Sequence, residues 1–364
     1  MKVTIVGAGI VGCAIAHELA LRGASVVVID PRGIGGGATR ASAGILAPAI
    51  EGHSTSLRRL LQCGLEAYDG FVRRLEAETG TALEYDRSGT LQLALDEAEA
   101  TELEEMARQL SGMNVPHQWL TPPEVSSLEP TTSARVTAAL SIPQHGYVAV
   151  GPLLGHLATA MSKRGVTVEN EVVTALERGA AGTRVVTAAR TIESDAVVVA
   201  AGSWSSSVAD LRVHPAPVRP IRGQLLRLRA PERLASRVLW GSRCYVVPWR
   251  DGSMLVGATV EDVGFDETAT TAGVRQLLDA SVELLPALDR ATFEEVRVGL
   301  RPMASDELPV IGASSLMPRL FYATGHYRNG VLLAPFTAAL VADLVVDGRE
   351  REELSITRPG RLRM

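Results

Sequence analysis

The glycines near the start of the chain have the spacing of a nucleotide-binding turn. Gly7, Gly9 and Gly12 form a Gly-x-Gly-x-x-Gly motif directly after the apolar segment VTIV. In such a motif the first glycine permits a tight turn, the second lets backbone approach a pyrophosphate, and the third lets the next helix pack on the sheet. Asp30 ends the next apolar segment, where a carboxylate can accept hydrogen bonds from a ribose diol. The pattern predicts a dinucleotide site rather than an ordinary glycine-rich turn, without distinguishing a nicotinamide cofactor from a flavin.

A second glycine turn lies near the other end of the chain. Gly325 and Gly330 enclose the segment HYRN and precede a long apolar segment. Amides at a helix start can bind an anion or a carbonyl group, and the alternative is a capped helix with a plain glycine turn. Two such turns suit an extended cofactor, with the pyrophosphate at the first turn and a reduced, negatively charged isoalloxazine ring at the second.

Arg301 and Tyr245 are candidates for binding a carboxylate. Arg301 ends the strand-like segment EEVRVGLR, and Tyr245 lies in the segment CYVVP. A guanidinium matches a carboxylate with two parallel N–H donors, and a tyrosine hydroxyl can add a third hydrogen bond. The alternative is that Arg301 is an ordinary surface residue, and the pattern alone does not decide between the two.

Conventional catalytic and metal-binding patterns are absent from the sequence. The seven histidines show no HxxxH or HxH spacing, and there is no GxSxG or GxxxxGK[ST] motif. The three cysteines are widely spaced and form no CxxC pair, which favours a reducing compartment over a disulfide framework. We therefore expect no metal site and no catalytic side chain, so that a cofactor would carry the chemistry.

The elements that must position these residues alternate along the chain. Helix and buried-strand patterns dominate the start, the middle and the end, whereas the segments between them favour an antiparallel sheet. We expect an α/β protein in which two discontinuous domains are interleaved, the second of them α+β. The predicted Rossmann-type, cofactor-binding domain comprises residues 1–82, 144–215 and 303–364, and the mainly antiparallel substrate domain comprises residues 83–143 and 216–302.

Length and charge narrow the class of protein further. A chain of 364 residues favours two lobes, and a net charge of −5 gives no reason to expect nucleic acid or an anionic membrane as a partner. The longest apolar segments are far shorter than the roughly 18–20 residues that span a bilayer. The first strand begins at residue 3, so we expect no signal peptide and a cytoplasmic protein.

Seven segments along the chain are distinctive when taken together: VTIVGAGIVGCAIAHELA, ATRASAGILAP, VRPIRGQ, YVVP, VGATVEDVGFD, GLRPMASDELPVIG and GHYRNGVLLAP. With these segments the chain resembles, nearly end to end, the D-amino-acid-oxidase-like FAD oxidoreductases and, within that family, its glycine oxidase (ThiO) subgroup of thiamine biosynthesis. The resemblance implies FAD bound across both glycine turns. Some members of the family attach the flavin to a cysteine late in the chain, and no cysteine follows Cys244 here, so non-covalent FAD is expected.

The resemblance also implies roles for single residues. Arg301 would bind the substrate carboxylate, with Tyr245 assisting and Arg328 beside the same site. The residues implied around the FAD are Gly7, Gly9, Ile10, Val11, Gly12, Asp30, Pro31, Thr39, Ala43, Gly44, Ile45, Val173, His326, Tyr327, Arg328, Asn329, Gly330, Val331 and Leu332.

Some positions near these depart from the family or bear on substrate preference. The family usually carries tryptophan four residues before the arginine, where this chain has Arg297. The apolar residues Ile45, Ala47 and Val260 are expected to line the pocket, and Arg243 to add positive charge near its entrance. These departures leave FAD binding unaffected and bear only on which amine is preferred.

The implied reaction is the oxidative deamination of glycine, and of sarcosine or small D-amino acids. Hydride would pass from Cα to flavin N5, and molecular oxygen would reoxidise the flavin to give hydrogen peroxide. The imine would hydrolyse to glyoxylate and ammonia or pass on to thiazole formation for thiamine. The alternatives are a D-amino-acid, sarcosine or proline dehydrogenase with another electron acceptor, and a non-catalytic flavin-binding module. Whether the chain forms a homo-oligomer stays open.

Overall fold

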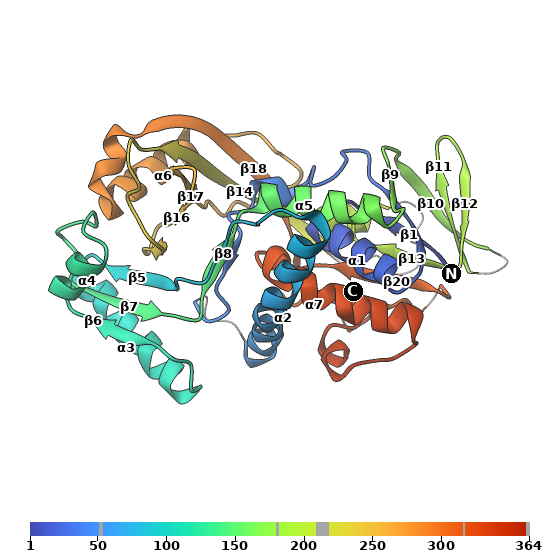
Figure 1. Cartoon of the computed structure of the whole chain (residues 1–364), viewed down its shortest axis with the longest axis horizontal. Coiled ribbons are helices and arrows are strands. Elements are labelled where there is room, and N and C mark those ends of the chain that lie inside the picture. The colour runs from blue at the N-terminus through green and yellow to red at the C-terminus, as the bar shows by residue number, and fades with distance from the viewer. Residues whose placement is uncertain (51–53, 180–181, 209–217, 316, 362–364) are drawn as a thin grey trace.

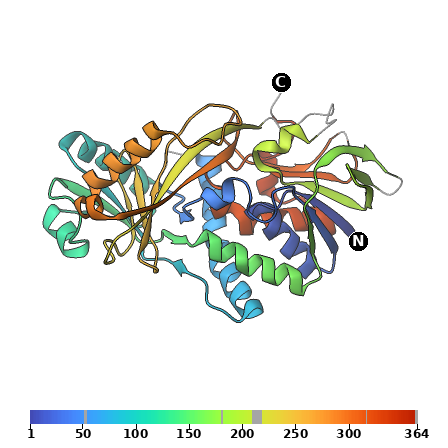
Figure 2. The same cartoon turned by 90° about the horizontal axis from the view of Figure 1, so that it is seen from above.

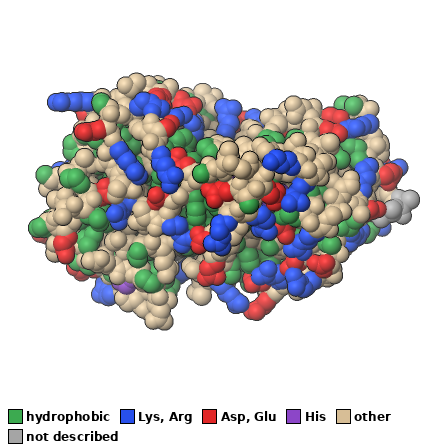
Figure 3. All heavy atoms as spheres, in the orientation of Figure 1, with side chains coloured by type: hydrophobic (Ala, Val, Ile, Leu, Met, Phe, Trp, Pro, Cys, Tyr) green, Lys and Arg blue, Asp and Glu red, His purple; other side chains and the backbone are tan. Residues whose placement is uncertain are grey.

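Two lobes lie side by side along the long axis of the molecule, with α2 (Thr55–Thr79), α5 (Val150–Lys163) and β8 (Gly146–Val148) near its middle (Figures 1 and 2). The structure is a computed structural model, and it describes residues 1–50, 54–179, 182–208, 218–315 and 317–361. On the face in Figure 3, basic and acidic side chains are intermixed over both lobes, so that face presents no large surface of one charge.

A six-stranded sheet organises the lobe that carries the first glycine turn. All its neighbouring strands are parallel except the first pair, β19 and β20, and its inner strands are buried, as expected for a sheet covered on both faces. The strand order is β19 (Val310–Ala313), β20 (Leu320–Thr324), β13 (Ala196–Val199), β1 (Lys2–Val6), β2 (Ser25–Ile29) and β9 (Thr167–Glu169).

Helices with apolar faces cover this sheet. The helix predicted after Gly9 is present as α1 (Ile10–Leu21), and it packs against α5 and against α7 (Gly330–Val346). The long helix α2 packs on α7, where the hydroxyl of Tyr68 donates to the carbonyl of Val331 over 2.8 Å. This contact fixes the start of α7, which follows the second glycine turn. None of the helices in the described ranges combines the length and the apolar character needed to cross a membrane.

An eight-stranded sheet organises the other lobe. Its neighbouring strands are antiparallel except for the parallel pair of β15 and β5, and α3 (Glu97–Gly112), α4 (Pro122–Leu128) and α6 (Thr271–Leu284) belong to this lobe. The strand order is β18 (Thr292–Ala304), β14 (Val218–Arg229), β17 (Ser253–Gly257), β16 (Tyr245–Pro248), β15 (Val238–Trp240), β5 (Thr90–Ala94), β7 (Ala138–Ile142) and β6 (Gln118–Leu120).

The strand β14 is longer than the sequence pattern predicts. The sequence pattern from Gln224 to Gly257 predicts short alternating strands, whereas β14 begins at Val218, is twelve residues long and is buried at most positions. It pairs with β18 on one edge and with β17 on the other, while α6 and two 3₁₀-helical turns, Ala38–Ala41 and Gly202–Ser207, pack against it. Packing on both faces removes the alternation that an exposed sheet face would produce.

Two three-stranded sheets complete the fold. One contains β3 (Ile45–Leu46), β8 and β4 (Tyr85–Asp86), and the other contains β10 (Val173–Arg178), β11 (Thr183–Thr187) and β12 (Thr191–Ser194). The segment VVTALERGAAGTRVVTAA (172–189) predicts a hairpin. The hairpin is present as β10 and β11, and residues 180–181 of the segment lie outside the described residues. The predicted domain boundary at residue 215 also lies outside them, and the division into domains stays a prediction.

Candidate active site

Residues of both glycine turns line one cavity of about 670 Å³, which is a typical size for a cofactor or ligand site. Strands of both large sheets contribute to its lining, and Arg301 and Tyr245 line it as well. Of the residues predicted to bind cofactor or substrate, all but Gly12 line this cavity. Residues at the two ends of the chain and in the middle of it are therefore brought together.

The first turn is shaped by close backbone contacts. Gly7 has a φ of +111°, and a Cβ atom on it would lie 2.3 Å from the carbonyl oxygen of Ala200. A Cβ on Gly12 would lie 2.0 Å from the carbonyl oxygen of Gly7, so Gly12 packs α1 against the turn rather than lining the cavity. The N-terminus of α1 thereby comes to the cavity wall, with its positive end toward a bound anion.

Asp30 and Thr39 stabilise this turn through side-chain hydrogen bonds. One carboxylate oxygen of Asp30 accepts from the amide of Ala8 over 2.7 Å, and the other accepts from the amide of Arg32 over 2.8 Å. The hydroxyl oxygen of Thr39 accepts from the amide of Ile10 over 3.0 Å. Asp30 thus lies at the predicted position beside the cavity, where it also holds the backbone of the turn.

The second turn leads into α7. Gly325 and Tyr327 have φ angles of +71° and +50°, and the amide of Tyr327 donates to the carbonyl of Pro302 over 2.8 Å. The imidazole Nε2 of His326 lies 3.0 Å from the hydroxyl of Thr337 in α7. Burial lowers the pKa of His326 to about 4, so this ring is neutral at pH 7. The turn therefore offers polar groups to the cavity without a titrating charge from His326.

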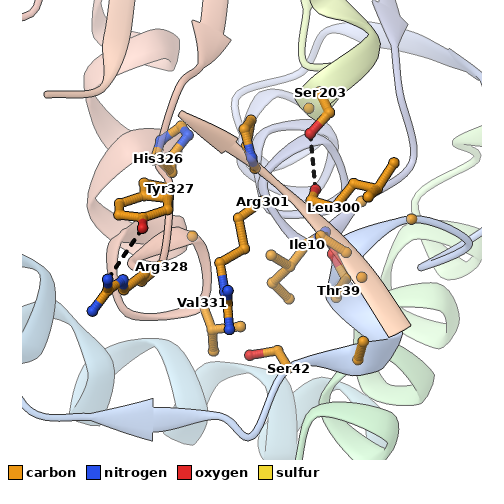
Figure 4. Close-up of a pocket in the computed structure, with 18 of the residues that line it drawn as sticks. Ile10, Thr39, Ser42, Ser203, Leu300, Arg301, His326, Tyr327, Arg328 and Val331 are labelled. Atoms are coloured by element: carbon orange, nitrogen blue, oxygen red, sulfur yellow. Dashed lines mark hydrogen bonds between the residues drawn. The ribbon is translucent and has the colours of Figure 1, made fainter. Parts of the chain in front are cut away.

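Arg301 extends from β18 into the cavity, toward Val331 and Ser42 (Figure 4). Its Nη1 donates to the carbonyl oxygen of Thr259 over 3.0 Å and to that of Arg222 over 3.4 Å. The guanidinium lies over the backbone of Gly223, where a Cβ would come within 2.3 Å of Nη2. The surface-residue alternative is therefore wrong, because Arg301 is a partly buried cavity residue.

Tyr245 reaches the same cavity from β16. Its ring lies 5.0 Å from the ring of Trp240, and a Cβ on Gly257 would lie 2.5 Å from its hydroxyl oxygen. Backbone and an aromatic ring therefore confine this side chain from two sides. Arg328 borders the cavity from the second turn, where its Nη2 donates to the hydroxyl of Tyr327 over 3.1 Å (Figure 4).

The positions that depart from the family fall in two groups. Ile45, Ala47 and Val260 line the cavity, and so does Arg243, which also pairs with Glu283 over 3.0 Å. Arg297 does not line the cavity, and its guanidinium lies over the ring of Trp249 at 5.4 Å. The Arg297 side chain, at the position where the family usually carries tryptophan, thus packs on Trp249 outside the lining of the cavity.

Sequence reasoning missed several lining residues. Trp204, with the Arg32 guanidinium 4.5 Å from its ring centre, and Trp240 line the cavity, as does Ser203, whose hydroxyl donates to the carbonyl of Leu300 over 2.8 Å. Ser203 and Trp204 lie in the 3₁₀-helical turn Gly202–Ser207, which begins three residues after the buried strand β13 ends at Val199. In open α/β sheets ligands bind at the carboxyl ends of strands. That position was the available signal for these two residues.

The lining fits a flavin dinucleotide. A glycine turn at a helix N-terminus suits a pyrophosphate, a carboxylate after β2 suits a ribose diol, and residues of a second turn line the same cavity. Gly44 lines the cavity with a φ of +73° and packs so tightly that a Cβ would lie 1.9 Å from the carbonyl oxygen of Val148. A nicotinamide dinucleotide would not require the second turn.

Comparison with known proteins agrees with this arrangement. Over 357 residues the chain is 33% identical to the glycine oxidase of Geobacillus kaustophilus (strain HTA426), covering 96% of this chain and 93% of that relative. A crystal structure of glycine oxidase from Geobacillus kaustophilus superimposes with a TM-score of 0.94 at 32% identity and covers 100% of both chains. The α/β fold predicted from the sequence is therefore confirmed.

A bifunctional relative is longer than this chain. The chain is 36% identical over 364 residues to the bifunctional protein ThiO/ThiG of Nostoc sp. (strain PCC 7120), with 97% of this chain and 54% of that relative covered. The chain thus spans about half the length of this relative.

Residues 2–344 match the DAO family model, described as FAD dependent oxidoreductase, so the resemblance found in the sequence is confirmed and the chain belongs to the DAO family of FAD-dependent oxidoreductases.

Proposed function

We propose that the chain is an oxidase that deaminates glycine, and also sarcosine or small D-amino acids. The products would be an imine that hydrolyses to glyoxylate and ammonia, and hydrogen peroxide from molecular oxygen. The observation that carries this proposal is that Arg301 and Tyr245 line the same cavity as both glycine turns. A carboxylate-binding pair beside a flavin site suits a substrate with a carboxylate next to the carbon that is oxidised.

The chain's own residues would hold the cofactor along the whole cavity. Gly7, Gly9, Ile10 and Val11 would face the pyrophosphate and Asp30 the adenosine ribose, while residues 39–45 and 326–332 would lie against the flavin. FAD, when bound, supplies the two-electron oxidation of the substrate. Amide dipoles at the second turn would stabilise negative charge on the ring system.

Arg301 and Tyr245 would orient the substrate. The guanidinium would bind the carboxylate through charge-assisted hydrogen bonds, and the Tyr245 hydroxyl would add another, which directs Cα into the cavity. The apolar side chains of Ile45, Ala47 and Val260 leave room for a small substrate. Arg301 is held by backbone carbonyls, so it is ordered before substrate arrives.

The substrate would bind with its amine already neutral. Among the lining residues that the structure describes, the carboxylates are Asp30 and Glu171, which follow β2 and β9 at the edge of the six-stranded sheet. His326 is neutral and hydrogen-bonded to Thr337. No side-chain base beside Arg301 is needed if the ammonium group loses its proton before binding.

The test is the purified, FAD-loaded protein supplied with glycine in air, with peroxide and oxygen uptake measured. Peroxide formation supports the oxidase. Dye reduction without peroxide would instead establish the dehydrogenase alternative, and absence of any flavin after reconstitution would contradict the whole proposal. A panel of glycine, sarcosine, D-alanine and D-proline, added anaerobically, would rank substrates by the bleaching of the flavin.

Substitution of Arg301 tests the carboxylate site. Arg301→Ala should raise the glycine KM by about a hundredfold while flavin content stays constant, because a buried charge-assisted pair is worth several kcal/mol. Arg297→Ala is the matched control, since this arginine lies on the same strand four residues earlier and does not line the cavity. An unchanged KM in Arg301→Ala would remove Arg301 from its role.

Further properties rest on this proposal. A role in forming the thiazole of thiamine and a cytoplasmic location are further predictions. Assembly into a homo-oligomer is another prediction, and the molar mass of the purified protein in solution tests it. Molecular oxygen and a small amine or amino acid are the partners that the proposal requires.

A further inference from the structure

The two carbonyl groups that accept from Arg301 belong to residues that converge on one carboxylate. Arg301 donates to the carbonyl oxygens of Thr259 and Arg222. Glu261 is hydrogen-bonded to both of these residues, although it does not itself line the cavity. The position of the guanidinium therefore depends on a side chain that no substrate would touch.

Glu261 fixes Thr259 through its first carboxylate oxygen. That oxygen accepts from the hydroxyl of Thr259 over 2.6 Å and from the Nε2 of Gln224 over 2.8 Å. The Thr259 hydroxyl oxygen in turn accepts from the amide of Gln224 over 2.9 Å. Thr259 and Gln224 are almost fully buried, so these bonds are shielded from competing water.

Glu261 fixes Arg222 through its other oxygen and through its backbone. The second carboxylate oxygen accepts from Nη2 of Arg222 over 2.6 Å, and the two backbones exchange N–H···O bonds of 2.8 and 3.0 Å. The side chain of Arg222 is only 4% exposed, so loss of Glu261 would leave a buried cation with one partner fewer. Asp266 is the other described partner, at 2.5 Å from Nη1.

Glu261 is ionised over the pH range in which the enzyme would work. Burial by itself would raise the pKa of this carboxyl, but hydrogen bonds from Arg222, Thr259 and Gln224 together hold it below its ordinary value. A carboxylate rather than a carboxylic acid is needed here, because all of its described partners at this site donate hydrogen bonds.

We propose that Glu261 is a positioning residue for the carboxylate-binding site, because it holds in place the carbonyl groups of Thr259 and Arg222 that orient Arg301. This inference rests on the proposed role of Arg301. It assigns a role in the substrate site to a residue that does not line the cavity and whose described side-chain partners are Arg222, Gln224 and Thr259. Displacement of a clamp by about 1 Å can reduce its effectiveness by up to a hundredfold, so such a residue can control substrate affinity from a distance.

The test is the affinity of the FAD-loaded protein for acetate, which carries the carboxylate of glycine without its amine. Acetate binding is followed by the change that it causes in the flavin absorption spectrum, at constant ionic strength. In Glu261→Ala we expect the acetate Kd and the glycine KM to rise by about tenfold or more, with kcat within about threefold of the original value. Glu261→Gln keeps an acceptor for Thr259, so its acetate Kd and glycine KM should lie between those of the original protein and those of Glu261→Ala.

Asp262→Asn is the matched control. Asp262 is the next residue in the chain and pairs with Arg219 at the surface, with no described contact to Thr259 or Arg222. An acetate Kd within about twofold of the original in Glu261→Ala, or an equal loss in Asp262→Asn, would overturn the inference. If Glu261→Ala does not retain FAD, Glu261→Gln decides, and a Kd equal to that of Asp262→Asn would likewise overturn it.

The experiment separates this inference from the proposed function. If the original protein binds acetate but does not oxidise glycine, the proposed substrate is wrong while the effect of Glu261 on carboxylate affinity is still measured. If Arg301→Ala binds acetate normally and Glu261→Ala does too, the proposed role of Arg301 fails and the inference fails with it.

Discussion

The guanidinium of Arg301 packs directly on the backbone of Gly223. A Cβ atom at residue 223 would lie only 2.3–2.6 Å from the nitrogen and carbon atoms of this guanidinium. Gly223 lies in β14 opposite Gly299 of β18, two residues from Arg301. A side chain at residue 223 would therefore occupy the space that the Arg301 guanidinium now fills. The nearest atoms are the end of a flexible side chain rather than backbone, which decides the consequence of a substitution.

Gly223→Ala should leave the fold intact and displace Arg301. The added methyl group pushes the guanidinium away from its carbonyl acceptors, so we expect the glycine KM to rise by about tenfold or more with FAD content unchanged. Steady-state kinetics and flavin absorption measure the two quantities. Gly155→Ala, in the open face of α5 where no atom lies within 4 Å, is the control. An unchanged KM would show that the guanidinium has room to move.

Tyr245 has the same relationship to Gly257. A Cβ on Gly257 would lie 2.5 Å from both Cζ and the hydroxyl oxygen of Tyr245. Gly257→Ala should therefore move the tyrosine ring against Trp240 and raise KM by several-fold, about as much as Tyr245→Phe, since each change removes one hydrogen bond to the carboxylate. The double variant should cost no more than the larger single one. Additive losses would contradict a shared cause.

The fold followed from sequence patterns that are local. The glycine motif predicts a helix after Gly9, which is present as α1, and the apolar segment 196–201 predicts a buried strand, which is present over residues 196–199 as β13. Both patterns act on neighbouring residues. The support of Arg301 was not predictable in this way. It depends on the register that sets Arg301 opposite Ile221, and on the carbonyl group of Thr259, which lies two residues after the end of β17. Register between strands eighty residues apart is decided by packing, which a single sequence does not display.

Substitution of Gly12 by alanine should have the opposite effect to substitution of Gly223, because it should disturb the fold itself. A Cβ there would lie 2.0 Å from the carbonyl oxygen of Gly7, and backbone cannot move aside cheaply. Gly12→Ala should thus lower the stability of the apoprotein by about 1–3 kcal/mol or more and lose FAD as a consequence. Thermal unfolding of the apoprotein separates this effect from a direct contact with the cofactor. Normal apoprotein stability with loss of FAD would mean that Gly12 faces the pyrophosphate instead.

His145 makes stability depend on pH. The ring is 1% exposed, with Nδ1 2.8 Å from the Thr90 hydroxyl. Burial, together with the nearby charge of Arg87, lowers its pKa to about 3. Between the ordinary histidine pKa of about 6.5 and this value, the unfolded chain binds a proton at residue 145 that the native protein does not, so stability falls as pH falls.

Replacement of His145 isolates this contribution. His145→Asn keeps a polar atom near Thr90 but does not titrate, so its stability should fall less steeply as pH falls through about 6.5. The difference between the two slopes should approach about 1.4 kcal/mol per pH unit about one pH unit below that value, where the unfolded histidine is almost fully protonated. His326, whose pKa is also lowered, remains in both proteins and cancels in the comparison. Thermal or urea unfolding between pH 5 and pH 7 gives the change of unfolding free energy with pH for each of the two proteins. This pH range is chosen because histidine is the side chain that ordinarily changes charge within about these limits. Equal slopes would mean that the native protein takes up a proton at His145 over the same pH range as the unfolded chain, so that the pKa of this ring is not lowered.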